Sequence, residues 1–190
     1  MARIRRIAAL LPLAAAAALV VVALSPAAST ARVNACDAYG SSSPTELTRQ
    51  QGRKAIQCLV NVERDAAGLR PLKRNKKLQR AAQRHNERMV GTGCFAHECP
   101  GESALDGRLD LVGYLKGNLT RWMFGENIAW GARERGTPRS IVAAWMASPG
   151  HRANILYGTF RQIGVGFSVG TPSGDPVGGV YTTDFGFRVR

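Results

Sequence analysis

The sequence is short of acidic residues and of histidine. It has 13 Asp and Glu against 26 Lys and Arg, a formal net charge of +13, and three histidines, His85, His97 and His151. A strongly basic protein favours anionic partners such as nucleic acid, acidic polysaccharide or anionic membranes. Any site that needs an imidazole, for proton transfer or for metal binding, is restricted to these three positions.

Aromatic residues are also sparse, at 7% of the chain, and none lies within the one dense basic cluster, Lys73–Lys77. Proteins that bind single-stranded nucleic acid place aromatic side chains among their cations to stack the bases. We therefore expect no specific nucleic-acid partner. The other basic residues are scattered along the sequence, and they fit either a solvated exterior or a surface for anionic envelope polymers.

Long apolar runs are absent except for one, Ile7–Leu24, which follows a basic start and precedes a stretch of small residues. This order predicts a signal peptide over residues 1–31, with cleavage after Ala28 or Ala31. A retained membrane anchor is the alternative, because the run reaches the ~18 residues that can span a bilayer. A processed chain is expected to be secreted, extracellular or in the cell envelope, and not integral to a membrane.

The sequence has only four cysteines, and all of them follow the predicted signal peptide. An even number in an exported chain predicts two disulfides. Zinc binding by these thiols is disfavoured because the usual close cysteine spacings are missing. Three pairings are open. We prefer Cys94 with Cys99, which closes a short loop, and Cys36 with Cys58, which pins the N-terminal arm.

No internal repeat divides the rest, so we expect a flexible arm over 32–43 and one domain over 44–190. A helix start is indicated by Ser43, Pro44 and Glu46, which form a capping box with proline at the first helical position. Apolar periodicity predicts helices near 44–68, 75–89, 103–115 and 137–148, a further turn at 151–156, and strands at 127–130, 163–169 and 180–187. Helices followed by strands favour an α+β fold.

Two of the histidines lie where they could carry chemistry. His97 and His151 stand at segment ends, and Glu126 opens a predicted strand. Two imidazoles and a carboxylate could hold a divalent metal such as Zn²⁺ with one position open for water. The same groups could instead transfer protons without a metal. His85 lies on the apolar face of its helix, where we expect a buried, hydrogen-bonded histidine.

Three ordered motifs resemble the CAP superfamily of cysteine-rich secretory, antigen 5 and pathogenesis-related proteins, in its bacterial secreted (SCP-like) branch. They are Phe-Ala-His at 95–97, Gly-Glu-Asn-Ile-Ala at 125–129 and Trp-Met-x-Ser-Pro-Gly-His-Arg-x-Asn-Ile-Leu at 145–156. Weaker matches lie at 61–72, 164–166 and 184–186. The resemblance covers residues 54–187.

The resemblance implies a three-layer α-β-α sandwich around a small, largely antiparallel three-stranded sheet, with an open cleft lined by two histidines and two glutamates. The matching positions here are His97, His151 and Glu126. In many eukaryotic members the second glutamate closes a Trp-x-x-Glu pattern, and this position is Ser148 here. Glu98 or Glu102, beside His97, could supply the missing carboxylate.

Fold membership does not select an activity. We expect a monomeric, non-catalytic binding module that holds a divalent metal and an extracellular lipid, glycan or peptide. A nuclease- or peptidase-like hydrolase is the alternative, with His97 and His151 as metal ligands and Glu126 activating water. A structural or stress-related envelope protein is a third.

Overall fold

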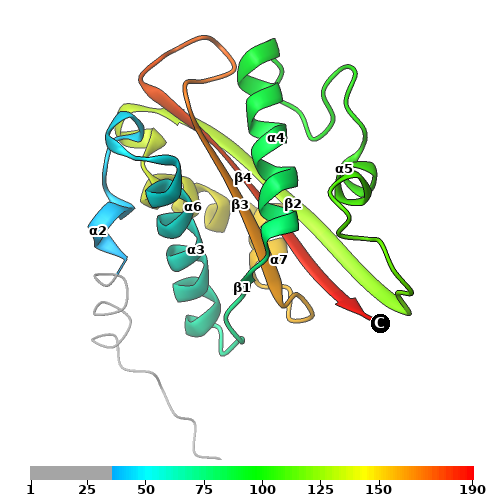
Figure 1. Ribbon diagram of the computed structural model, residues 1–190. Coiled ribbons are helices and arrows are strands. Elements are labelled where there is room, and N and C mark those ends of the chain that lie inside the picture. The colour runs from blue at the N-terminus through cyan, green and yellow to red at the C-terminus, as the bar shows by residue number, and fades with distance from the viewer. Residues whose placement is uncertain (1–35) are drawn as a thin grey trace, which may run out of the picture.

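The computed structural model describes residues 36–190 of the chain (Figure 1). The predicted signal peptide and its cleavage site lie outside the described residues. Within 36–190, no helix has the length and apolar character needed to cross a membrane.

Helices surround a four-stranded sheet. The elements are α2 (Asp37–Gly40), η1 (Pro44–Glu46), α3 (Arg49–Ala66), β1 (Lys73–Arg74), α4 (Lys76–Thr92), α5 (Leu105–Leu111), β2 (Arg121–Ala132), η2 (Arg133–Gly136), α6 (Pro138–Ala147), α7 (Pro149–Ile155), β3 (Gln162–Val169) and β4 (Gly178–Val189). The expected mixed α+β class is confirmed.

The sheet has the strand order β1-β3-β4-β2. Strand β4 pairs antiparallel with both β2 and β3, and β1 runs parallel to β3. The expected number of three strands is therefore wrong by one. The additional strand is only two residues long and exposed, so no alternation of apolar and polar residues marks it in the sequence. Strand β2 also begins at Arg121, earlier than predicted, because it pairs with β4 along its whole length.

Helices cover both faces of this sheet. Helix α4 packs closely on β3, where added Cβ atoms at Gly164 and Gly166 would overlap the α4 backbone at Leu78 and at Ala82. Glycine is required at these two positions because the helix backbone approaches the strand directly. Helix α5 flanks α4, while α3, α6 and α7 lie on the other side of the sheet (Figure 1).

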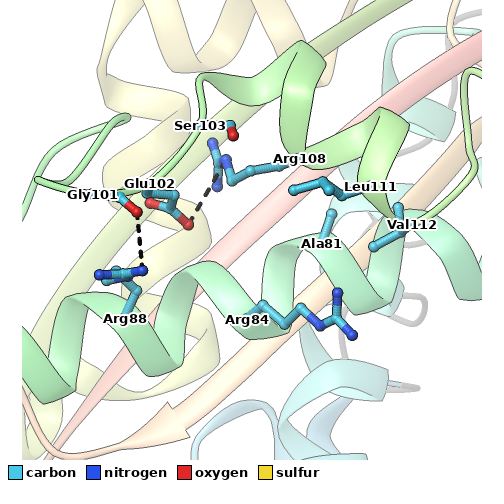
Figure 2. Close-up of a pocket in the computed structure, with 9 residues that line it drawn as sticks. All are labelled: Ala81, Arg84, Arg88, Gly101, Glu102, Ser103, Arg108, Leu111 and Val112. Atoms are coloured by element: carbon cyan, nitrogen blue, oxygen red, sulfur yellow. Dashed lines mark hydrogen bonds and ion pairs between the residues drawn. The ribbon is translucent and has the colours of Figure 1, made fainter.

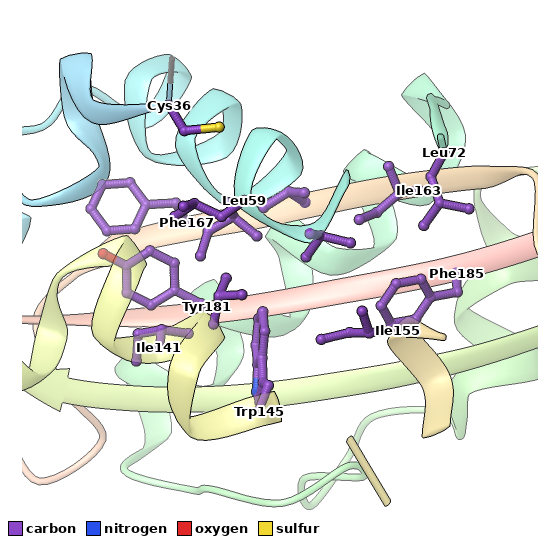
Figure 3. Close-up of a cluster of buried hydrophobic side chains, with 14 of the residues drawn as sticks. Cys36, Leu59, Leu72, Ile141, Trp145, Ile155, Ile163, Phe167, Tyr181 and Phe185 are labelled. Atoms are coloured by element: carbon purple, nitrogen blue, oxygen red, sulfur yellow. The ribbon is translucent and has the colours of Figure 1, made fainter. Parts of the chain in front are cut away.

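The main hydrophobic core fills the space between the sheet and α3, α6 and α7. Alternate residues of β3, Ile163, Val165 and Phe167, point into it, together with Trp145 of α6 (Figure 3). The period of two along β3 leaves its glycines on the α4 face. This packing fixes the sheet that carries the residues described below.

The first long helix begins later than predicted. The Glu46 side chain does accept a hydrogen bond from the Ser43 backbone N–H, but it caps only the single turn of η1. Helix α3 starts at Arg49, where the Thr48 hydroxyl accepts from the Gln51 backbone N–H. A second capping box, formed by Thr48 and Gln51, follows the first one closely, and it indicates that a new helix begins there.

Both preferred disulfides form. Cys36 pairs with Cys58 and Cys94 with Cys99, with Cα–Cα distances of 5.7 and 5.9 Å. The first joins the chain before α2 to the middle of α3. The described part of the segment expected as an arm therefore contains a short helix tied to the domain.

Candidate functional site

The candidate site is centred on Glu126, in the middle of β2. Its side chain is buried, with 3% of its surface exposed. Nδ1 of His97 donates to one carboxylate oxygen at 2.8 Å. One terminal nitrogen of Arg108, on α5, lies 2.9 Å from both oxygens. The buried carboxylate is thus held by one imidazole and one guanidinium from different elements.

His97 lies in the loop that the Cys94–Cys99 disulfide closes. Its backbone carbonyl accepts from Arg108 at 3.1 Å, and its side chain is 60% exposed. The hydrogen bond to Glu126 raises the pKa of His97. Because Nδ1 is occupied, Nε2 is the ring nitrogen left for a ligand.

The ionisation of Glu126 depends on the same contacts. Burial alone would raise its pKa, but the His97 hydrogen bond and the positive charge of Arg108 outweigh burial and lower the pKa. The carboxylate is therefore ionised at neutral pH, and its two oxygens already accept three hydrogen bonds.

His151 stands in the first turn of α7 and is half-buried. Its carbonyl accepts from the Asn127 side chain at 3.0 Å. The amide of Asn154 donates to the Glu126 carbonyl at 3.1 Å and to the Asn127 side chain at 2.9 Å. Burial, followed by the charge of nearby His97, lowers the pKa of His151. Two asparagines thus fix α7 beside the strand that carries Glu126.

The structure places the candidates for a second glutamate elsewhere. Glu98 is exposed, and Ser148 precedes α7 without capping it through its side chain. Glu102 is bonded to His85, whose Nδ1 lies 2.7 Å from the carboxylate. His85 itself is fully buried, as expected from its place on the apolar helix face. Burial lowers the pKa of this histidine.

Sequence reasoning missed two residues of this region, Arg108 and Asp184. Arg108 connects the two pairs, since its Nε lies 4.0 Å from Glu102 while its terminal nitrogen holds Glu126. Asp184 faces Glu126 across the β2–β4 ladder and is completely buried. Within residues 36–190 no histidine, arginine or amide donor is bonded to either of its carboxyl oxygens, and the carboxyl faces that of Glu126. Burial, and then the negative charge of Glu126, raise the pKa of Asp184 well above its usual range.

The donor set at this site is small for a metal. Within residues 36–190, no group of three or more His, Cys, Asp or Glu side chains is arranged to hold a metal ion. Glu126 fits the role of ligand poorly, because Arg108 lies against both of its oxygens. It fits the role of the carboxylate that orients a ligating histidine well. His97 and His151 remain as the two side chains that could contact a cation.

Comparisons with known proteins agree with the fold and its motifs. The family model of the cysteine-rich secretory protein family, CAP, matches residues 58–185. The uncharacterized protein YkwD of Bacillus subtilis is 33% identical over 126 residues, which are 66% of this chain and 45% of that protein.

Two solved structures share the fold. An extracellular protein containing an SCP domain, from Bacillus anthracis, matches with a TM-score of 0.59 and 26% identity over 72% of this chain and 40% of that one. An outer surface protein of Borrelia burgdorferi matches with a TM-score of 0.62 and 15% identity over 75% of this chain and 97% of its own. The chain spans less than half the length of the two Bacillus relatives.

Proposed function

Since the chain belongs to the cysteine-rich secretory protein family, CAP, we propose that it is exported and acts outside the cytoplasm as a binding module. In this proposal His97 and His151 contact the ligand, and the protein releases the ligand without any chemical reaction. The extracellular and outer-surface descriptions of the relatives support export.

The hydrogen bonds and the lowered pKa of Glu126 favour a binding function over hydrolysis. A general base must accept a proton from water on a free oxygen, within hydrogen-bond reach. The Glu126 oxygens are instead occupied by His97 and Arg108, and the pKa of the carboxyl is lowered, which weakens it as a base. Its contacts suit a different task, which is to hold the exposed imidazole of His97 in one orientation.

A divalent cation such as Zn²⁺ would find only two protein ligands in this arrangement. His97, through Nε2, and His151 would hold it. A bound cation would offer a Lewis-acidic contact for an oxygen of an extracellular lipid, glycan or peptide. The lowered pKa of His151 keeps its imidazole neutral near pH 7, which is the form that binds metals, whereas the raised pKa of His97 favours its protonated form and weakens this second ligand. With two protein donors, we expect weaker binding than at a structural zinc site with four.

The test is zinc binding by the mature protein, measured by isothermal titration calorimetry. We expect one Zn²⁺ per chain for the wild type and none for His97→Ala with His151→Ala. Glu98→Ala is the matched control, because this exposed carboxylate lies beside His97, and it should bind zinc as the wild type does. Equal zinc binding by the wild type and the double-histidine variant would contradict the metal site.

Turnover separates the binding module from the hydrolase. Wild-type protein with Zn²⁺ is incubated with nucleic-acid, peptide and ester substrates, and product is measured by chromatography. We expect no product above the rate of the double-histidine variant. Hydrolysis that is present in the wild type and lost in Glu126→Gln would replace the binding proposal with the hydrolase.

A further inference from the structure

Four basic side chains form a ladder along α4. Lys76, Arg80, Arg84 and Arg88 follow one another at intervals of four residues, so they lie one above another on one side of the helix. The first three are exposed. Like charges at this spacing repel one another and destabilise a helix. Helix α4 contains a single acidic residue, Glu87, so the repulsion is left largely uncompensated.

Hollows in the surface extend this ladder on both sides of α4. Two adjoining hollows of about 240 and 390 Å³ lie between α3 and α4 at the β1 edge of the sheet, and both are lined by Arg53, Arg74 and Gln79. Arg84 lines the second of them and also a third, of about 230 Å³, between α4 and α5. In that third hollow Arg84 and Arg88 come from α4 and Arg108 from α5 (Figure 2).

The three hollows follow one another from α3 across α4 to α5, because neighbouring hollows share lining residues. We call this surface the α4 basic track, and its cationic residues are Arg53, Lys54, Arg74, Lys76, Arg80, Arg84, Arg88 and Arg108. Two carboxylates lie in the same hollows: Glu87 pairs with Arg49 at 3.3 Å, and Glu102 lies 4.0 Å from Nε of Arg108, whose terminal nitrogen also holds Glu126. The charge of Arg108 is therefore compensated, and the excess positive charge of the track lies on its residues from α3, β1 and α4.

Buried arginine nitrogens without an acceptor also indicate that the track binds an anion. Arg108 is 5% exposed, and within the described chain its Nε and its second terminal nitrogen have no hydrogen-bond acceptor. The Nε of Arg53 is likewise buried without an acceptor in this part of the chain. Buried donors without a partner cost free energy, which an acceptor from a bound anion would offset.

The lining also indicates what kind of anion fits. Glutamines alternate with the cations, since Gln50, Gln57, Gln79 and Gln83 line the two hollows at the β1 edge. Amide groups both donate to and accept from hydroxyls. No Phe, Tyr or Trp lines any of the three hollows, so the track has no platform for stacked bases. We propose that the α4 basic track binds an acidic polysaccharide, independently of His97 and His151.

The test is binding of polygalacturonate to the mature protein, measured by microscale thermophoresis at low and at moderate salt. The charge reversal Arg80→Glu with Arg84→Glu is compared with Lys116→Glu and Arg135→Glu, which makes the same change of net charge at exposed positions outside the track. We expect the track variant to bind at least about tenfold more weakly and the control to bind within about threefold of the wild type. Wild-type affinity should fall steeply with salt.

The track variant should fold at least as well as the wild type, because its new glutamates pair with Lys76 and Arg88 at helical spacing. Its melting temperature is measured alongside binding, and Arg80→Gln with Arg84→Gln is used if the reversal melts lower. His97→Ala with His151→Ala should bind the polymer as the wild type does.

Four results would overturn the proposal. Equal weakening in the track variant and its control would mean that only net charge matters. A flat salt response, or equal binding of neutral dextran, would exclude an ionic site. Tighter binding of a 20-nucleotide single strand, in competition with polygalacturonate, would assign the track to nucleic acid instead.

Discussion

The molecule contains two histidine–carboxylate pairs with nearly the same contact and opposite surroundings. His85 and Glu102 meet at 2.7 Å, and His97 and Glu126 at 2.8 Å, each through Nδ1. The His85 side chain is fully buried, whereas that of His97 is 60% exposed. Accordingly, burial lowers the pKa of His85, and the hydrogen bond to Glu126 raises that of His97.

The two histidines differ in accessibility and not in the pair that each forms, and only the exposure of His97 is consistent with the binding role proposed for it. Arg108 lies between the two carboxylates and compensates both. What differs is the element that presents each imidazole, since His85 belongs to the buried side of α4 and His97 to a disulfide-closed loop. Of these two imidazoles, only that of His97 is exposed to solvent.

The largest expected effect is the contrast between His85→Ala and His97→Ala. Removing His85 leaves a cavity and strands the Glu102 carboxylate, so we expect a loss of about 3 kcal/mol in the free energy of unfolding. His97→Ala removes an exposed partner and should cost about 1 kcal/mol or less. Urea unfolding at pH 7 measures both losses, and equal losses would contradict a structural role for His85 that His97 lacks.

Glu126→Gln changes the buried member of the His97–Glu126 pair. We expect a loss of about 2 kcal/mol, since Arg108 keeps its position but loses its counter-charge, and a lower pKa of His97 in an NMR titration.

The pH dependence of this loss has a definite sign. The contribution of Glu126, whose folded pKa is lowered, is present above its ordinary value of 4.5 and is lost as the pH falls through the folded pKa. That of His97, whose folded pKa is raised, is present below 6.5 and is lost as the pH rises through the folded pKa. The difference between wild type and variant should therefore be largest between these two values, and a difference that grows steadily above pH 7 would contradict the pairing.

Asp184→Asn should have the smallest effect on the free energy of unfolding. Asp184 is a third buried carboxyl, and within residues 36–190 it receives no hydrogen bond from a histidine or arginine side chain, unlike Glu126 and Glu102. Its raised pKa means that folding costs free energy as the pH rises above the ordinary value of 3.8, because the folded state retains the proton. The amide should therefore raise the stability at pH 7 by about 1 kcal/mol, with little gain at pH 3. Thermal melts at the two pH values measure this, and a variant less stable at pH 7 would show that the carboxyl has a partner.

The sequence predicted the features that depend on residues close together in the chain. Apolar periodicity and the turn at Ser148-Pro149 placed most of the elements, whereas the cap at Ser43 misplaced the start of α3 because it closes only the single turn of η1. The strand register and the length of β2 were missed because they depend on pairing with β4. Order of motifs pointed to His97 and Glu126, which the structure brings into contact. Arg108 had no signal among 26 basic residues, and the partner of Glu102 could not be read from a separation of 17 residues along the chain.

The sequence by itself determined the family and the mixed class of the fold, because these follow from motif order and local periodicity. It left three disulfide pairings open and only favoured the pairing that forms. The tertiary structure decided the rest. It buried one histidine–carboxylate pair and exposed the other, because only the packing of α4, α5 and β2 sets the solvation that each imidazole experiences. It also gathered basic residues scattered over α3, β1, α4 and α5 into one track, because helical periodicity and helix packing bring together charges that lie far apart in the chain.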